Sequence, residues 1–129
     1  MSDAPATNHG SLPAEISRSI VQLIREYTGR GPTQARTMLM PDTVMVVLAD
    51  TLTKGERKLV EHGRLDQVLQ TRQQVQRMMR DDAVAMIESA VDRKVVAFFS
   101  DNHAEPDMAV EVFLLEPEER ASELGPIPD

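Results

Sequence analysis

The chain has 129 residues, of which 41% are hydrophobic and 27% charged, and this composition indicates one globular domain with a single core. The net charge of −7 argues against general nucleic-acid binding, which depends on neutralising phosphates with Lys and Arg. Cysteine is absent, so disulfides, thiolate metal sites and cysteine nucleophiles are excluded, and no apolar run approaches the ~20 residues that cross a membrane.

Both ends of the chain differ in composition from its middle. Residues 1–11 are polar and lack the basic and apolar regions of a signal peptide, so we predict a disordered N-terminal tail and a cytoplasmic protein. Residues 116–129 are acidic and contain proline, which predicts a loosely attached C-terminal tail. The single folded domain is expected over residues 12–115.

The first half of this domain predicts a helix followed by two strands. Ser11 is a suitable N-cap, and Gly29 suits the left-handed position just after a helix. Residues 35–40 and 43–49 have strand character and are joined by a Pro-Asp turn. Both faces of the second strand are apolar, so we expect a central strand that helices or a partner chain cover on both sides. The apolar residues of the helix recur at helical spacing: Ile16, Ile20, Leu23, Ile24 and Tyr27.

The second half predicts two helices followed by two more strands. Thr53 and Glu56 have the spacing of a capping box, which predicts the start of a short helix. A long helix is expected at about 65–91, and strands at 94–101 and 108–115. The apolar stripe of the long helix is Leu65, Val68, Val75, Met79, Ala83, Met86 and Ala90.

This order of elements, α-β-β-α-α-β-β, predicts an α+β fold. We expect two β-hairpins to form a mostly antiparallel four-stranded sheet with the long helix packed on one face. A second copy could cover the remaining apolar sheet or helix face, so a homodimer is the expected assembly.

The segment between the first helix and the first strand is the first candidate site. Gly29, Gly31 and Pro32 bend or fix the backbone on both sides of Arg30, a placement that would aim its guanidinium. Such a guanidinium, with Arg36 further along the chain, could bind a carboxylate or phosphate through paired hydrogen bonds. The alternative is a helix stop with a solvated arginine, and the residue types alone favour that alternative.

Arg72 is the second candidate, because it lies within the apolar stripe of the long helix, between Val68 and Val75. An arginine there must extend to solvent, pair with an acid or face a partner, since burying it alone is costly. The sequence leaves the structural and functional alternatives equally open.

Motifs for catalysis or metal binding are missing from the sequence. His103 lies among acids in the loop 101–107, but no second histidine has the spacing to complete a metal site, and a polar hairpin loop is favoured. No Gly-x-Ser-x-Gly motif marks a nucleophile, and no carboxylate pair can be assigned to acid–base work. We therefore expect no metal, no cofactor and no enzymatic activity.

Basic side chains outnumber acids between residues 53 and 80. They could meet an acidic partner or an anionic membrane surface, or be neutralised by the acidic tail, but ordinary solvation is favoured. The basic residues are Lys54, Arg57, Lys58, Arg64, Arg72, Arg77 and Arg80, against Glu56, Glu61 and Asp66.

Several of these features together resemble one protein family. They are the helix end at residues 26–32, Arg36, the Val-rich strand ending at Leu48, Leu52-Thr53 with Glu56, Arg72 in the long helix, and the last hairpin with Asp101 and residues 112–114. The resemblance is to MpsC, a component of a Na+-translocating membrane-potential-generating system formerly filed as a domain of unknown function, and it covers about residues 13–115. It implies an accessory role beside a membrane complex that moves cations or inorganic carbon, and it supplies no catalytic residue.

Two functions remain open on the sequence. The first is a non-enzymatic, homodimeric accessory or regulatory protein that binds a partner protein, such as the cytoplasmic face of a membrane transporter, through the edge formed by Arg30 and Arg36 or through the basic helix. The second is a small-anion sensor in which Arg30, Arg36 and Arg72 converge on a carboxylate, phosphate or bicarbonate. Neither involves nucleic acid.

Overall fold

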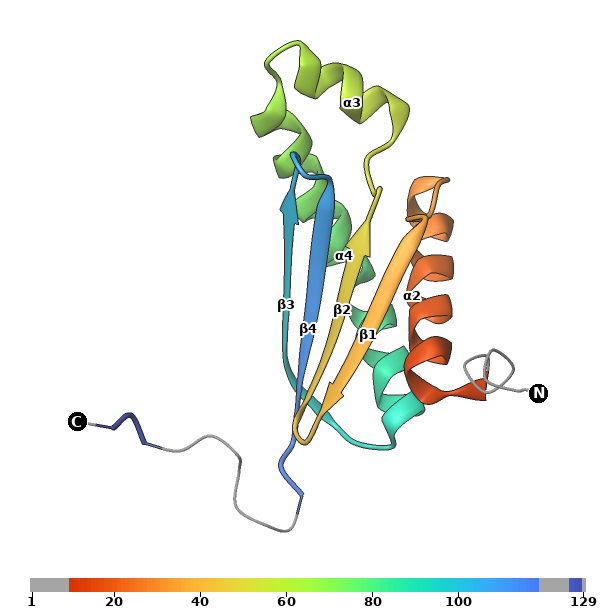
Figure 1. The fold of residues 1–129 in the computed structure, drawn as a ribbon, viewed down its shortest axis with the longest axis vertical. Helices are drawn as coiled ribbons and strands as arrows, with labels where there is room; N and C mark the ends of the chain where they lie inside the picture. Colours follow the sequence, from red (N-terminus) through yellow and green to blue (C-terminus); the bar gives the residue numbers. More distant parts are fainter. Residues whose placement is uncertain (1–9, 119–125, 129) are drawn as a thin grey trace.

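The computed structural model describes residues 10–118 and 126–128 and shows the predicted α+β order (Figure 1). The four strands form one antiparallel sheet in the order β1-β2-β4-β3, so the two hairpins meet where β2 pairs with β4. The predicted tails fall largely on residues 1–9, 119–125 and 129, which lie outside the described residues. The elements are α2 (Leu12–Thr28), β1 (Gln34–Met40), β2 (Thr43–Ala49), α3 (Lys54–Glu61), α4 (Leu65–Val91), β3 (Val95–His103) and β4 (Met108–Leu115).

Local signals set the ends of α2 as the sequence predicts. The Ser11 hydroxyl accepts a hydrogen bond from the Ala14 N–H at 3.2 Å, and proline occupies the first turn. Gly29 follows the helix with a φ of 81°, in the left-handed region that glycine adopts without strain. The helix buries Ile16 and Ile20 completely, or nearly so, against the sheet.

The capping box of α3 is also confirmed. The Thr53 hydroxyl accepts from the Glu56 N–H at 3.1 Å, and the Glu56 carboxylate accepts from the Thr53 N–H at 2.8 Å. The helix ends at Glu61 and is followed by the C-cap residue His62, whose Nδ1 lies 2.8 Å from the Lys58 carbonyl oxygen. This short helix has no buried residue and extends beyond the end of the sheet, at the top of Figure 1.

The core lies between the sheet and the two longer helices, α2 and α4, which pack on the same face (Figure 1). Within the described residues, helices cover this face only, although the sequence indicates a central strand that is apolar on both faces. The buried core side chains of the sheet are Val44, Val46 and Leu48 of β2 and Ala109, Phe113 and Leu115 of β4.

The buried stripe of α4 differs from the predicted stripe at both ends. Val68, Met79, Ala83 and Ile87 are buried, whereas Leu65 is 37% exposed and Ala90 is exposed. The reason is geometric, because a straight helix of this length rotates relative to a fixed heptad pattern. The end of the helix at Leu65 also lies beside α3, away from the core.

Phe113 lies at the centre of the core, is fully buried and has its ring centroid 4.8 Å from that of Phe98. We expect Phe113→Ala to lower the free energy of unfolding by about 3–5 kcal/mol, because the cavity it leaves cannot fully collapse. Denaturant unfolding measures this change. The matched control is Met78→Ala on α4, because the Met78 side chain is 65% exposed. This substitution should lower the free energy of unfolding by less than about 1 kcal/mol. Equal losses for the two variants would contradict the assignment of Phe113 to the core.

Candidate functional site

The backbone around Arg30 has a conformation that only small residues permit. Gly29 has its φ of 81°, and its N–H donates back to the last turn of α2 at 2.8 Å. Gly31 and Pro32 are buried against α2. A Cβ on Gly31 would lie 3.0 Å from Cγ1 of Val21 and 3.2 Å from its carbonyl oxygen, so a larger side chain would force the segment away from the helix. These residues fix the point from which the arginine extends.

The Arg30 guanidinium binds the loop that follows β2. Its Nη1 donates to the carbonyl oxygens of Asp50 at 2.7 Å and Leu52 at 3.1 Å, and its Nη2 lies 2.8 Å from the Asp50 carboxylate. The same carboxylate accepts from the Thr33 hydroxyl at 2.8 Å and pairs with Arg57. The acid that Arg30 binds is therefore supplied by the protein itself.

Asp107, in the turn before β4, binds this loop as well. Its Oδ1 accepts from the Thr51 N–H at 3.0 Å and the Thr51 hydroxyl at 2.8 Å, and its Oδ2 accepts from the Leu52 N–H at 3.0 Å. Its Oδ2 also lies 3.3 Å from Nη2 of Arg57. Because the Asp50 N–H donates to the Asp107 carbonyl at 3.1 Å, the loop is tied firmly to the neighbouring hairpin.

Arg72 reaches the loop from α4. Its Nε and Nη2 donate to the two carboxylate oxygens of Glu56 at 3.0 and 2.7 Å, and its Nη1 donates to the Thr51 hydroxyl at 3.0 Å. The side chains of Arg72 and Glu56 are only 15% and 20% exposed. Of the three alternatives that the sequence leaves for Arg72, the structure shows pairing with an acid. We call Arg30, Asp50, Glu56, Arg57, Arg72 and Asp107 the end cluster.

Hydrogen bonds keep the carboxylates of the end cluster ionised. The Thr33 hydroxyl, followed by Arg30, holds the pKa of Asp50 below its usual value. Burial alone would raise the pKa of Glu56, but its hydrogen bonds, chiefly the one with Arg72, lower that pKa overall. Burial alone would also raise the pKa of Asp107, but the hydrogen bonds that its carboxylate accepts from the backbone and side-chain donors of the loop lower that pKa overall. The cluster therefore neutralises its own charges.

Arg36 lies apart from the other two candidate arginines. It is an exposed residue of β1, paired in register with Val47, and it faces away from the helices because its neighbour Thr37 faces α2. Its side chain makes no hydrogen bond or ion pair with another residue of the described chain. The structure brings Arg30 and Arg72 to one loop, but it does not bring the three arginines into one pocket.

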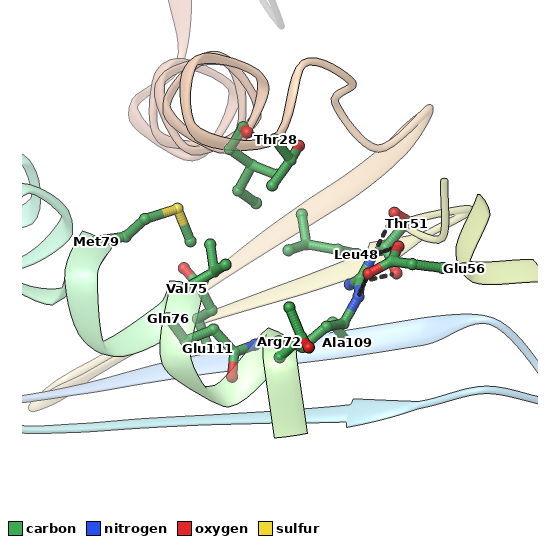
Figure 2. Close-up of a pocket in the computed structure, with 12 residues that line it drawn as sticks. Thr28, Leu48, Thr51, Glu56, Arg72, Val75, Gln76, Met79, Ala109 and Glu111 are labelled. Atoms are coloured by element: carbon green, nitrogen blue, oxygen red, sulfur yellow. Dashed lines mark hydrogen bonds and ion pairs between the residues drawn. The ribbon is translucent and has the colours of Figure 1, made fainter. Parts of the chain in front are cut away.

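A cavity lies beside Arg72, between α2, α4 and the sheet (Figure 2). Its volume of about 60 Å³ suits a few water molecules rather than an organic ligand. Val75, Gln76 and Met79 of α4 and Glu111 of β4 are among the residues that line it. Glu111 is 3% exposed, and its Oε1 has no hydrogen-bond partner among the described residues. Burial raises the pKa of its carboxyl to about 7.

The end cluster can hold in place the loop that follows β2. Among the described residues, no three His, Asp or Glu side chains are placed to hold a metal ion. The Nδ1 of His103 lies 2.8 Å from the Pro106 carbonyl oxygen, and both oxygens of the Asp107 carboxylate accept hydrogen bonds from the loop.

Sequence reasoning missed several of these partners, although signals for them exist. Asp50 directly follows β2 and Asp107 directly precedes β4, so the pairing of these antiparallel strands places the two acids at the same end of the sheet. Glu111 occupies a core-facing position of β4, between the buried Ala109 and Phe113. An acid at a position where the alternation predicts an apolar residue is itself a signal for a special environment.

The fold and the site define a small α+β domain in which internally paired charges fasten one end of the sheet to the helices. Within the described residues, no helix combines the length and the apolar character that crossing a bilayer requires.

The chain belongs to the family described as Na+-translocating membrane potential-generating system (MpsC), whose model matches residues 8–117. A relative from Bacillus subtilis (strain 168), named Uncharacterized protein YbcI, is 31% identical over 108 residues, which are 82% of this chain and 86% of the relative. No solved structure matches the chain. The resemblance that the sequence indicates is thereby confirmed.

The Arg72–Glu56 pair gives a stability prediction. We expect Arg72→Ala to lower the free energy of unfolding by about 2–4 kcal/mol, because it leaves a mostly buried carboxylate without its cation. Thermal and denaturant unfolding measure the loss. Arg77→Ala, an exposed arginine of the same helix, is the matched control and should change stability by about 0.5 kcal/mol or less. A loss no larger than that of the control would show that the pair contributes nothing.

Glu111 gives a pH prediction of defined sign. The carboxyl binds its proton more tightly in the folded protein, with a pKa of about 7 against 4.5, so stability should fall as pH rises from about 4.5 to above 7. The full loss is about 3 kcal/mol. Glu111→Gln, which cannot ionise, should flatten this part of the stability–pH curve. Unfolding measured in denaturant from about pH 5 to about pH 8 tests this, and a variant that retains the wild-type slope would contradict it.

Proposed function

We propose that this chain is a non-enzymatic accessory or regulatory protein of a Na+-translocating system, and that it acts by binding a partner protein. Family membership supports the transport context. The end cluster supports a non-enzymatic role, because its guanidiniums and carboxylates bind one another. The partner we propose is the cytoplasmic face of a membrane complex that moves cations or inorganic carbon.

The surface of α3 is the observation that carries this proposal. The helix is amphipathic, yet none of its residues is buried, and Leu59 is 40% exposed. Leu65, at the start of α4, is 37% exposed beside it. The capping box and the Glu56–Arg72 pair hold the helix in place, so its surface is already ordered. A preformed surface lowers the entropic cost of binding.

The charge around α3 indicates the kind of partner. Lys54 and Lys58 of α3 and Arg64 just after it are exposed, as is Leu59, whereas the neighbouring Arg57 pairs with Asp50 and Asp107. Cations around an apolar centre favour a partner surface that is acidic and has an apolar contact of its own. These cations belong to the basic set that the sequence shows between residues 53 and 80, of which Arg57 and Arg72 are paired internally.

The candidate arginines contribute to this proposal in different ways. Arg30 pairs with Asp50 and positions the loop that leads into α3, whereas Arg36 is exposed on the other face of the sheet. The alternative function, a small-anion sensor, would require an anion to displace Asp50 from Arg30 or Glu56 from Arg72. Partner binding requires no such exchange and is therefore the better-supported proposal.

Charge reversal on α3 tests the partner. We expect Lys58→Glu with Arg64→Glu to reduce co-purification with the detergent-solubilised membrane subunits of the organism's own Na+-translocating system by about tenfold or more. Arg25→Glu with Lys94→Glu reverses two exposed cations elsewhere and should leave retention unchanged. Equal retention by the two double variants, or no retention of wild type, would refute the proposal.

Thermal unfolding of the purified protein tests the alternative function, the small-anion sensor. A rise in melting temperature with phosphate or bicarbonate that is abolished by Arg72→Ala would favour the sensor over partner binding. Chloride at equal ionic strength is the control for screening.

A further inference from the structure

The sheet face opposite the helices carries a regular pattern of side chains. Strand pairing aligns the outward-facing residues in four rows that run across the sheet from β1 through β2 and β4 to β3. The rows are Gln34–Ala49–Met108–His103, Arg36–Val47–Val110–Asp101, Met38–Met45–Val112–Phe99 and Met40–Thr43–Leu114–Ala97.

The middle of this face is apolar, and several apolar side chains of the face are exposed to solvent. The two middle strands contribute mostly Val, Met and Leu, and no described helix covers them. Phe99 is 58% exposed, Met40 43% and Met108 37%. An exposed apolar surface along the middle of a sheet face marks an interaction site rather than ordinary solvent-exposed surface.

The charges on this face lie at opposite edges of one row. Arg36 is on the β1 edge and Asp101 on the β3 edge, with Val47 and Val110 between them. Neither side chain forms an ion pair with another described residue; the Asp101 carboxylate accepts only the N–H of Asn102, at 2.8 Å. The width of the sheet separates the two charges, so they cannot pair within one chain.

We propose that a second copy of this chain packs on the open sheet face, related by a two-fold axis that runs parallel to the strands between β2 and β4. This rotation places β1 of each copy over β3 of the other and maps every row onto itself. Arg36 of each copy then faces Asp101 of the other, so the dimer contains this ion pair twice. Paired sheets of this kind pack about 10 Å apart with strands within about 30° of each other, a separation that these two side chains can span.

The other rows agree with the same axis. It places Gln34 opposite His103, polar against polar, and Met38 opposite Phe99, a favourable sulfur–aromatic contact. A two-fold axis perpendicular to the strands, in the plane between the two sheets, would instead place β1 of one copy over β1 of the other. It would also place the row that contains Arg36 and Asp101 opposite the apolar row that contains Met38 and Phe99. Because a two-fold interface must be complementary to itself, the pattern of the rows selects the first axis.

Two charge reversals and their combinations test this arrangement. Arg36→Asp alone and Asp101→Arg alone each place like charges opposite one another twice, and should weaken the dimer by about tenfold or more in sedimentation equilibrium. The double variant Arg36→Asp with Asp101→Arg restores both pairs with their signs exchanged and should return the dissociation constant to within about threefold of wild type. Arg77→Asp, an exposed site on α4, makes the same change in net charge as Arg36→Asp and should have no effect.

Mixing the two single variants gives an independent measurement. In the mixed dimer, the aspartate introduced by Arg36→Asp faces the arginine introduced by Asp101→Arg. The unchanged Arg36 of one chain faces the unchanged Asp101 of the other, so both contacts are attractive. We expect the mixture to form heterodimers at concentrations where each variant alone is monomeric.

Three results would each overturn the proposal: a monomeric wild type, single variants that dimerise as wild type does, or a double variant and a mixture that both stay weak. Sedimentation equilibrium measures the mass of the assembly, and the substitutions lie outside α3. The result is therefore independent of partner binding at that helix.

Discussion

The loop between β2 and α3 is held by charged and polar side chains from separate parts of the chain, and the position of α3 depends on this attachment. Arg72 is central, because one guanidinium joins α4 to Glu56 of α3 and to Thr51 of the loop. A mostly buried ion pair adds little net stability, since desolvation offsets the attraction. Its main effect here is to define geometry: the loop and the short helix have one arrangement in which all of these groups are satisfied.

The ion pairs of the end cluster also decide which charged side chains are left at the surface. Two of the three arginines that the sequence leaves free for a ligand, Arg30 and Arg72, are paired internally at this end of the sheet, and Arg36 lies apart from them, so the three do not form an anion pocket. Two other surfaces remain open, namely the basic surface around α3 and the apolar face of the sheet. They belong to different parts of the fold, so one could hold a partner protein while the other holds a second copy of the chain.

Glu111 is an exception in an otherwise apolar core. Its carboxyl is buried beside a small cavity, and its raised pKa means that ionisation at neutral pH opposes folding. The surrounding helices and strands are consistent with their sequences, so this acid is a local conflict of the kind that proteins retain at strained or functional positions. Glu111 lines the same cavity as Arg72 and Gln76 of α4, the helix that also holds the end cluster.

The sequence by itself determined the helices, the strands and the family of this protein. Periodicity, caps and turns act over a few residues, which is why α4 begins at Leu65 and ends at Val91 as predicted. Only the tertiary structure decided the partners of the arginines. Arg30 binds a residue 20 positions away, because the β1–β2 hairpin places Gln34 opposite Ala49. Arg72 binds a residue 16 positions away, because α4 packs beside α3. The alignment of Arg36 with Asp101 across the sheet also depends on the pairing of β2 with β4, a long-range contact between two hairpins that no local pattern specifies.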